Sequence, residues 1–456
     1  MKDMALSEKL VQTVPSARQA AWQALEFTAF LHFGINTFTN REWDTGQDDI
    51  SLFDPTELDT DQWCRALKSA GIRACIITAK HHDGFCLWDT KYTEHSVMHT
   101  PCKVDIVARL SESCKKYGLK MGVYLSPWDR HEATYGQGKA YDDYFCSQLT
   151  ELLTNYGPIY TVWFDGANGE GPNGKKQVYD WQRYYALIRQ LQPEAVISVC
   201  GPDVRWCGNE AGDCRTSEWS VVPERLMSQR YVAEHSQQED STAFRKKLSN
   251  QDEDLGSRAL MAQEEGFIWY PAEVDTSIRP GWFYHAEEDD QVRPLDKLLH
   301  IYLNSVGGNS VLLLNIPPDR RGLLAEPDCV RLQEIGTFLQ ETFSEDLAGQ
   351  AGITCDPELA LEAEGMPEAK IELTWDAPRS IGWVVLQEDI LKSQRVEAFR
   401  IEAETAQGLQ TVFRGTVIGY KKICHLEMPV ETCRLQIVLE SYRVQPFLKT
   451  PQIFAP

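Results

Sequence analysis

The chain alternates short apolar runs with amphipathic stretches from residue 27 to about residue 343, and this alternation limits the fold more than any other feature. Near-continuously apolar runs of this length are typical of strands that are buried on both faces, as in parallel sheets. We expect strands at 27–38, 73–81, 120–128, 160–166, 195–203, 267–275 and 310–318.

Helical patterns fill the gaps between these runs. The stretch 105–118 places Ile106, Val107 and Leu110 on one face and ends at Gly118, a residue that commonly terminates helices. Further helices are expected at 61–71, 142–156, 180–191, 295–305 and 328–343.

Repeated strand-then-helix units predict a parallel sheet, and at this length a closed (β/α)8-like barrel is favoured. Seven strands are recognisable rather than eight, so the barrel is either irregular or hides a strand in the polar stretch 204–266. An open doubly wound sheet is the alternative, but no GxGxxG motif follows the first strand.

The pattern changes after Ser344. Short runs with period-two alternation are separated by turn residues over 370–442, and no long helix appears. This rhythm predicts an antiparallel β-sandwich. We therefore expect two domains, a barrel that carries the site over residues 1–345 and a C-terminal β-sandwich over residues 346–456.

Composition excludes several classes of partner. The 45 basic and 67 acidic side chains give a net charge of −22, which repels phosphate backbones and anionic membranes, so neither nucleic acid nor membrane is expected to bind. No stretch is apolar enough for a membrane span, and the first residues lack the apolar core of a signal peptide. The 13 cysteines include no CxxC pair, as expected of free thiols in a reducing compartment, so we expect a cytoplasmic protein.

Polar and ionisable residues follow the expected strands, and in a (β/α) barrel the carboxyl ends of the strands form the functional face. Five successive strand ends carry such groups. Together they support a functional site more strongly than a single polar residue at one strand end would. The residues are His32 after the first strand, His81, His82 and Asp83 after the second, Tyr124 and Asp129 after the third, Asp165 after the fourth, and Arg205 and Glu210 after the fifth.

Two chemistries are compatible with this set. His32, His81, His82 and Asp83 could bind a metal such as zinc or manganese, although adjacent histidines on one strand end diverge and the His-x-His spacing is missing. Alternatively, Asp165 could act as a nucleophile while a second carboxyl donates a proton, as in retaining glycosidases. The second carboxyl would be Glu210 or Glu218. The surrounding Trp and His side chains would then form a sugar pocket.

Several motifs resemble those of one known family. The segments FLHFGINTFTNREW, ITAKHHDGFCLWDTKYTEHSV, GVYLSPWDRH, VWFDGANG and VLLLNIPPDRRGLL are similar, in order, to the barrel motifs of the α-L-fucosidases of glycoside hydrolase family 29. The stretch IGWVVLQEDILKSQRVEAFRIEA resembles the β-sandwich that follows the barrel in that family. The resemblance implies a retaining α-L-fucosidase that uses no metal or other cofactor and acts on a fucosylated oligosaccharide.

The resemblance also implies roles for individual residues. Asp165 in VWFDG matches the family's nucleophile, and Glu210 in RWCGNE matches the acid/base of the branch selective for α-1,3/1,4-linked fucose on branched, Lewis-type glycans. The positions that match fucose-contacting residues are His32, Glu42, Trp43, His81, His82, Tyr124 and Trp282.

Alternatives remain open at this point. If the chain follows the broad-specificity branch, a different Glu serves as the acid/base. Two further alternatives are a metal-dependent barrel hydrolase and a sugar-binding protein without catalysis. Beyond the first sugar, Trp128, Asp129, His131 and Glu132 either contact a neighbouring galactose or form an exposed polar loop, and 204–248 suits a wall of the acceptor site.

Overall fold

Eight parallel strands form the centre of the molecule in the computed structural model, which describes residues 2–248, 253–355 and 369–456. Their order in the sheet is β5-β4-β3-β2-β1-β10-β9-β6. A bridge between Ser198 and Val204 brings β5 next to β6 and nearly closes the barrel. The strands are β1 (Phe27–Leu31), β2 (Ala74–Lys80), β3 (Lys120–Leu125), β4 (Ile159–Phe164), β5 (Val196–Val199), β6 (Arg205–Trp206), β9 (Ala272–Ser277) and β10 (Val311–Asn315).

The predicted barrel is confirmed, and the structure locates its eighth strand. β6 is only two residues long and follows β5 with no helix between them, so it leaves no periodic signal in the sequence. The expected strand 267–275 is wrong as a single element, because Pro271 divides it. Its first part is β8 (Phe267–Trp269), which pairs with β7 (Val221–Pro223) outside the barrel, and its second part belongs to β9.

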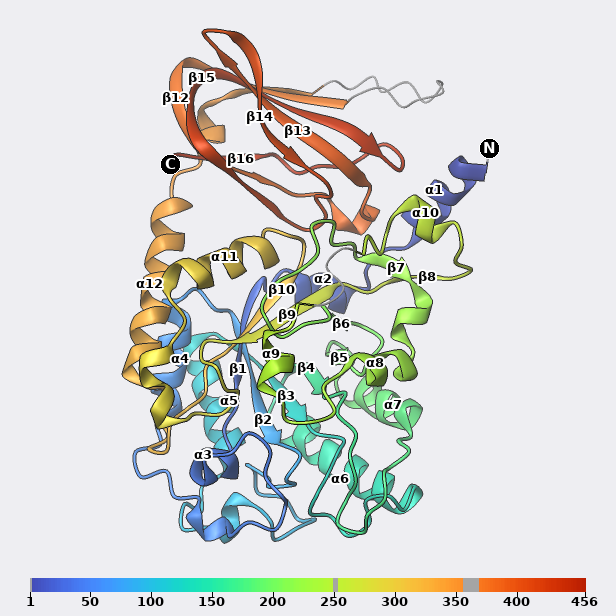
Figure 1. The fold of residues 1–456 in the computed structure, drawn as a ribbon, viewed down its shortest axis with the longest axis vertical. Coiled ribbons are helices and arrows are strands. Elements are labelled where there is room, and N and C mark those ends of the chain that lie inside the picture. The colour runs from blue at the N-terminus through green and yellow to red at the C-terminus, as the bar shows by residue number, and fades with distance from the viewer. Residues whose placement is uncertain (1, 249–252, 356–368) are drawn as a thin grey trace.

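Helices surround the barrel, as Figure 1 shows. The Asp105 side chain caps the first turn of α5, and Gly118 ends that helix in the left-handed conformation with φ 69°. The helices that follow barrel strands are α3 (Ile35–Thr39), α4 (Thr60–Ser69), α5 (Ile106–Tyr117), α6 (Lys139–Asn155), α7 (Trp181–Leu191), α11 (Leu295–Ser305) and α12 (Glu326–Thr342). The remaining ones are α1 (Lys2–Gln12), α2 (Ala17–Gln23), α8 (Gln229–His235), α9 (Thr242–Lys246) and α10 (Arg258–Met261).

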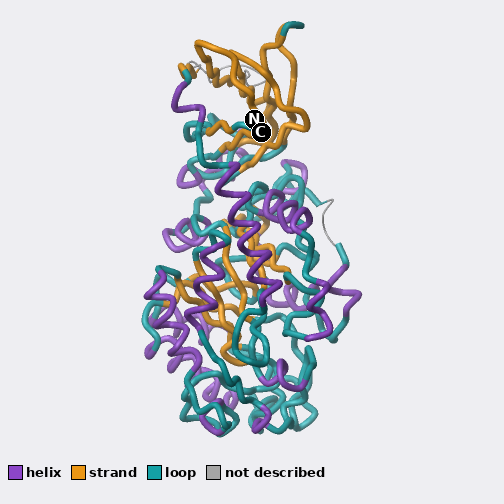
Figure 2. The backbone as a smooth tube through the Cα atoms, turned by 90° about the vertical axis from the view of Figure 1, so that its left-hand side faces the viewer, coloured by secondary structure: helices purple, strands orange, loops and turns teal. Residues whose placement is uncertain are grey.

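The C-terminal part is an antiparallel sheet with its own apolar core, and Figure 2 shows it stacked above the barrel. The register between β12 and β15 shifts after Thr374 and again after Ile381, so these long strands bend over that core as the predicted β-sandwich requires. The strands are β11 (Gly352–Cys355), β12 (Ala369–Leu386), β13 (Val396–Thr405), β14 (Gly408–Gly415), β15 (Lys422–Tyr442) and β16 (Gln452–Phe454).

This sheet joins the barrel where β10 begins. Asn309 N–H donates to the Lys421 carbonyl at 3.0 Å, and Ile423 N–H donates to the Gly307 carbonyl at 3.1 Å. These contacts precede β10, whereas the polar residues singled out in the sequence follow the strands. The C-terminal sheet therefore supports the barrel from the end opposite the expected site.

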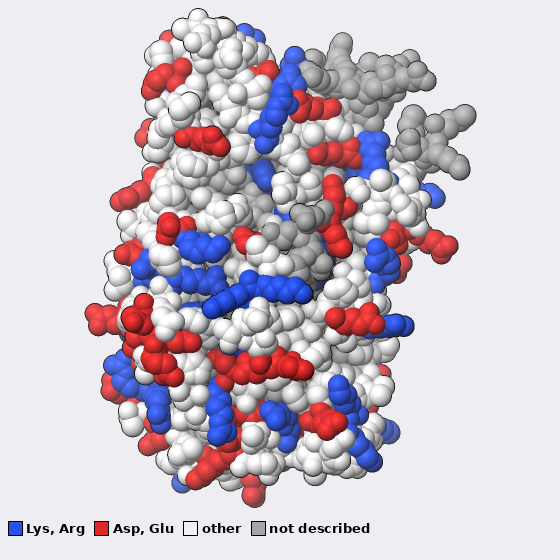
Figure 3. Space-filling model, in the orientation of Figure 1, with Lys and Arg blue, Asp and Glu red and all other residues white. Residues whose placement is uncertain are grey.

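The surface carries charges of both signs. On the face drawn in Figure 3, acidic and basic side chains are interspersed rather than gathered into one field, although the whole chain has a net charge of −22. In the described residues no helix is both long and apolar enough to cross a membrane. All 13 cysteines carry free thiols.

A buried ion pair fixes the turn that follows β2. Lys80 Nζ lies 2.9 Å from Asp129 Oδ2 and donates to Gln148 Oε1 at 2.9 Å, and both charged side chains are almost completely buried. Burial acts to raise the pKa of Asp129, but the charge of Lys80 and several hydrogen bonds outweigh it and hold that pKa below its ordinary value. The pair anchors the loop after β3 against the end of β2, directly before His81 and His82.

Replacing Lys80 by Met should destabilise the protein strongly, because it leaves the Asp129 carboxylate buried without its cation. We expect the free energy of unfolding to fall by about 3–5 kcal/mol, seen as a lower midpoint of thermal unfolding by circular dichroism. Lys139→Met is the matched control, because Lys139 forms an exposed pair with Asp143 on α6, and its midpoint should equal that of the wild type. Equal midpoints for the two variants would contradict the prediction.

Candidate active site

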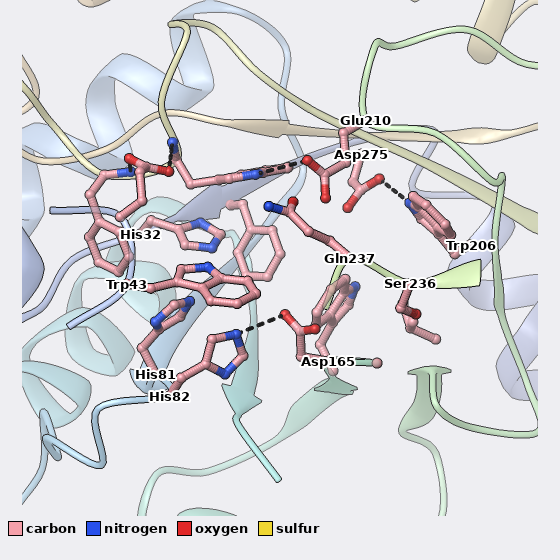
Figure 4. A pocket seen from close by; sticks show the side chains of 17 residues that line it. His32, Trp43, His81, His82, Asp165, Trp206, Glu210, Ser236, Gln237 and Asp275 are labelled. Atoms are coloured by element: carbon pink, nitrogen blue, oxygen red, sulfur yellow. Dashed lines mark hydrogen bonds and ion pairs between the residues drawn. The ribbon is translucent and has the colours of Figure 1, made fainter. Parts of the chain in front are cut away.

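A pocket opens at the carboxyl ends of the barrel strands, with about 630 Å³ of space between its lining atoms when the open mouth is included. Figure 4 shows the lining side chains converging from the strand ends, from the loop after β9 and from the segment around α8 and α9. Eight residues singled out in the sequence line it, namely His32, Glu42, Trp43, His81, His82, Asp165, Glu210 and Trp282.

Asp165 follows directly after β4, and its carboxylate direction is fixed by two hydrogen bonds. Tyr124 Oη donates to Oδ2 at 3.1 Å, and the Ala167 N–H donates to Oδ1 at 2.8 Å. His82 Nε2 lies 3.8 Å from Oδ2, and the Asp165 side chain keeps 26% of its surface exposed to the pocket. Tyr124 thus contributes to the site through Asp165, although it does not line the pocket itself.

Glu210 occupies the other side of the pocket, four residues after β6. Trp282 Nε1 donates to its Oε2 at 3.2 Å. Burial, together with the nearby carboxyl of Asp275, raises the pKa of Glu210 well above its ordinary value. The Glu210 carboxyl group therefore holds its proton to higher pH than an ordinary glutamate, and it faces the Asp165 carboxyl group across the pocket.

The three histidines are neutral. Burial lowers the pKa of His32 and that of His82 to about 4 each. It also lowers the pKa of His81 well below its ordinary value, and His82 adds to that effect. His32 Nδ1 lies 2.8 Å from Asn315 Oδ1, and His82 Nδ1 lies 2.7 Å from Ser126 Oγ. Each of these two rings is thereby oriented and keeps Nε2 for the pocket. A neutral imidazole can donate to or accept from a hydroxyl group.

Glu42 ties three segments of the chain together. It accepts from the Trp282 N–H at 2.9 Å and the Phe283 N–H at 3.1 Å, and its Oε1 lies 2.8 Å from His285 Nε2. Arg245 of α9 lies 3.4 Å from its Oε2. Burial acts to raise the pKa of Glu42, but the His285 hydrogen bond and the charge of Arg245 outweigh it, so that pKa lies below its ordinary value.

Aromatic rings form much of the pocket wall. The Trp282 ring lies 5.1 Å from His32, and Trp43 meets His82 edge-on at 5.1 Å. Tyr124 stacks on Trp163 at 5.3 Å. Such walls suit a ligand with an apolar face and hydroxyl groups, because the rings supply the apolar contact and the imidazoles supply the hydrogen bonds.

Residues 228–247, called the cover segment below, form one wall of the pocket. The sequence did not predict which of these residues line it. Ser236 and Gln237 line the pocket, and in Figure 4 Gln237 reaches across it toward His32. A Cβ atom on Gly166 would lie 1.9 Å from Ser236 Oγ, so the cover segment requires glycine after Asp165. This stretch has no hydrophobic period, and only its tertiary contacts place it here. It supports the expectation that 204–248 forms a wall of the site.

Other lining residues were also missed, above all Asp275 and Phe283. The sequence contained a signal that could have predicted Asp275. Glu273 and Asp275 are two positions apart in one strand, so their side chains must point to the same side. The alternative carboxyl Glu218 lies outside the pocket, fully buried and bonded to Arg205. Arg205 is thus committed to Glu218 and does not line the pocket beside Asp165.

Two residues of the loop after β3 are engaged in contacts within the protein. Asp129 is bonded to Lys80, and His131 stacks on His95 with ring centroids 3.9 Å apart. Trp128 packs behind the pocket, 4.9 Å from His82. Neither alternative given for Asp129, contact with a neighbouring galactose or a place in an exposed polar loop, holds, because its carboxylate is buried and bonded to Lys80.

The metal alternative has no support in the described part of the chain. There, no group of three or more His, Cys, Asp or Glu side chains has the geometry to hold a metal ion. His81 and His82 are adjacent, but His82 directs its ring toward Asp165 and Ser126.

Comparison with known families and proteins agrees with the geometry. The α-L-fucosidase family model matches residues 11–343. Alpha-L-fucosidase 1 of Arabidopsis thaliana is 38% identical over 461 residues, which cover 95% of this chain and 86% of the plant protein. A relative from Oryza sativa is 38% identical over 469 residues, covering 97% of this chain and 85% of that protein.

Solved structures give the same result. A provisionally assigned α-L-fucosidase from Bacteroides ovatus is 46% identical, with a TM-score of 0.87, and the match covers 99% of this chain and 76% of that one. A Ruminococcus gnavus family 29 fucosidase, solved in complex with fucose, is 26% identical, with a TM-score of 0.81 and coverage of 97% and 95%.

Proposed function

This chain belongs to the α-L-fucosidase family, glycoside hydrolase family 29, and from that premise we propose that it removes terminal α-1,3/1,4-linked L-fucose from branched, Lewis-type oligosaccharides, with Asp165 as nucleophile and Glu210 as acid/base. One observation carries these roles. Asp165 and Glu210 face the same pocket, one hydrogen-bonded and partly exposed, the other desolvated with a raised pKa.

The first step forms a covalent intermediate. A carboxylate oxygen of Asp165 attacks the anomeric carbon of fucose, the bond from that carbon to the leaving oxygen breaks, and Glu210 donates its proton to that oxygen. Tyr124 and the Ala167 N–H direct the attacking carboxylate. The raised pKa of Glu210 favours the protonated form that this step needs.

The second step releases the sugar. Glu210, now ionised, takes a proton from a water molecule, the water oxygen attacks the same anomeric carbon, and the bond to Asp165 breaks. Two displacements at one carbon give net retention of configuration. Asp165 leaves as a carboxylate and Glu210 is again protonated, so the cycle closes without an oxidant, a reductant or a metal.

The remaining candidates form the fucose pocket. The neutral imidazoles of His32, His81 and His82 bond ring hydroxyls, and Trp43 and Trp282 line the apolar faces. Glu42 holds the loop that carries Trp282. The likeness of the whole chain to a Ruminococcus gnavus fucosidase solved in complex with fucose supports this choice of sugar.

Support for the linkage comes from the segment that carries Glu210. The sequence VRWCGNEAGDCRTSEW resembles the α-1,3/1,4-selective branch. Trp206 of this segment stacks on Phe244 of the cover segment, with ring centroids 6.2 Å apart, beside Glu210. A broad-specificity enzyme with a different Glu as acid/base is less well supported, because Glu42, the other Glu among the lining residues, is committed to His285 and Arg245.

Asp165→Gly should abolish hydrolysis of an aryl α-L-fucoside, because no nucleophile remains. Sodium azide should restore turnover and yield the fucosyl azide of inverted configuration, identified by proton NMR. Asp89→Gly removes an exposed carboxylate outside the pocket and should behave like the wild type. Hydrolysis by Asp165→Gly without azide would overturn the assignment of the nucleophile.

Glu210→Ala should slow cleavage of substrates whose leaving group needs a proton by about 10²–10⁴-fold in kcat/KM. Fucosyl fluoride, whose leaving group needs little protonation, should keep nearly the wild-type kcat/KM and so serves as the internal control. An equal loss on both substrates would show that Glu210 is not the general acid.

A Lewis a trisaccharide should be a better substrate than an aryl α-L-fucoside or an α-1,2-linked fucosyl lactose, by about tenfold or more in kcat/KM. The physical reason is binding of the branched leaving group along the wall made by Trp206 and the cover segment. Released fucose is measured by chromatography. A preference for the simple aryl fucoside would refute the proposed linkage selectivity while leaving the fucosidase activity intact.

A further inference from the structure

A second carboxyl group stands beside Glu210 and has no part in the reaction as described so far. Asp275 lies on β9, two positions after Glu273, so both side chains point to the same side of the strand, into the barrel. Asp275 has only 4% of its surface exposed, yet it lines the pocket. Figure 4 shows its carboxyl group and that of Glu210 at the same end of the pocket, with Asp165 at the other.

Each of these two carboxyl groups is held by one tryptophan. Trp206 Nε1 donates to Asp275 Oδ1 at 2.6 Å, and Trp282 Nε1 donates to Glu210 Oε2 at 3.2 Å. An indole N–H fixes the direction of a carboxyl group but brings no positive charge. The two acids are therefore oriented side by side in a buried place without a cation of their own.

The charged and titratable groups around Asp275 are mostly acidic. Glu273 faces it from the same strand, Asp165 from the end of β4, and Glu210 and the buried thiol of Cys207 from the stretch after β6. On the cover segment, Arg245 acts on Glu210 but is engaged by Glu42 and Asp240.

Two neighbouring acids in such a place lose their protons one after the other. Burial raises the pKa of Asp275 to about 8, and burial together with the Asp275 carboxyl raises the pKa of Glu210 well above its ordinary value. Once Asp275 is ionised, its negative charge opposes the loss of the Glu210 proton, because like charges close together in a desolvated site repel strongly.

We propose that Asp275 is a positioning residue for the acid/base of this enzyme: its carboxyl group, oriented by Trp206 beside Glu210, keeps the catalytic proton on Glu210 and so sets the alkaline limit of activity. This inference rests on the proposed role of Glu210. It assigns to Asp275 an effect on the protonation of Glu210 and no contact with the reacting atoms.

Asp275→Asn tests the proposal most directly, because the amide oxygen can still accept from Trp206 while the charge is removed. The alkaline limb of kcat/KM against pH, measured on an aryl α-L-fucoside with a poor leaving group, should move to lower pH by about one unit or more. The acidic limb should move little and serves as the internal reference. With fucosyl fluoride the alkaline limb should be much less affected, because that leaving group needs little protonation.

A second variant separates charge from packing. Trp206→Phe keeps an aromatic ring next to Phe244 but cannot donate to Asp275, so the carboxyl remains and the alkaline limb should stay above that of Asp275→Asn. If Trp206→Phe reproduces the shift in full, Asp275 acts only by placing Trp206 and the inference is wrong. Circular dichroism melting curves verify that both variants fold.

The outcomes also distinguish this inference from the proposed function. If Glu210→Ala loses as much activity on fucosyl fluoride as on the aryl fucoside, the acid/base assignment itself fails. If Glu210→Ala behaves as a general-acid variant but Asp275→Asn keeps the wild-type alkaline limb, only the role of Asp275 is refuted.

Discussion

The strands of the barrel are buried on both faces, and this one constraint dictates where polar chemistry can occur. Along β1, β2 and β10 every residue is buried, so ionisable groups have room only where the strands end or point into the barrel. Because all eight strands are parallel, their carboxyl ends lie on one side and their polar residues meet there. The same burial removes water from these groups, which raises the pKa of acids and lowers that of histidines.

Because these groups are buried, each charged side chain depends strongly on the partner that it bonds. Lys80 and Asp129 carry opposite charges behind the pocket, and together they fix the turn from which His81 and His82 project. Glu42 plays a similar part at the rim, where it holds the backbone of Trp282 and, through Arg245, the cover segment. The loops that shape the pocket are thus held by buried carboxylates with several donors each, while the C-terminal sheet stabilises the barrel from its other end.

The sequence was informative where local physics dominates. Apolar runs located most barrel strands, caps such as Asp105 and Gly118 bounded a helix, and strand-end residues identified the pocket because parallel topology forces them together. It was uninformative where only tertiary contacts decide. The two residues of β6 are too few to show a hydrophobic period, and Pro271 divides a run that reads as one strand. The cover segment has no hydrophobic period that would predict its place in the pocket wall. The role of Asp275 depends on a neighbour about sixty-five positions away along the chain, Glu210, which no local pattern reveals.

Five buried acids in and around the pocket fall into two groups by the kind of hydrogen-bond donor that they receive. Asp129 and Glu42 receive a charged lysine or arginine, and the pKa of each lies below its ordinary value despite burial. Three other buried acids receive only a neutral indole, and the pKa of each lies above its ordinary value. These pairs are Glu273 with Trp163, Asp275 with Trp206, and Glu210 with Trp282. A charged partner would orient a carboxyl group equally well but would also favour its ionised form. Tryptophan at these three positions therefore gives direction without charge, which is what a site needs if it is to hold a proton on a carboxyl group beside a carboxylate nucleophile.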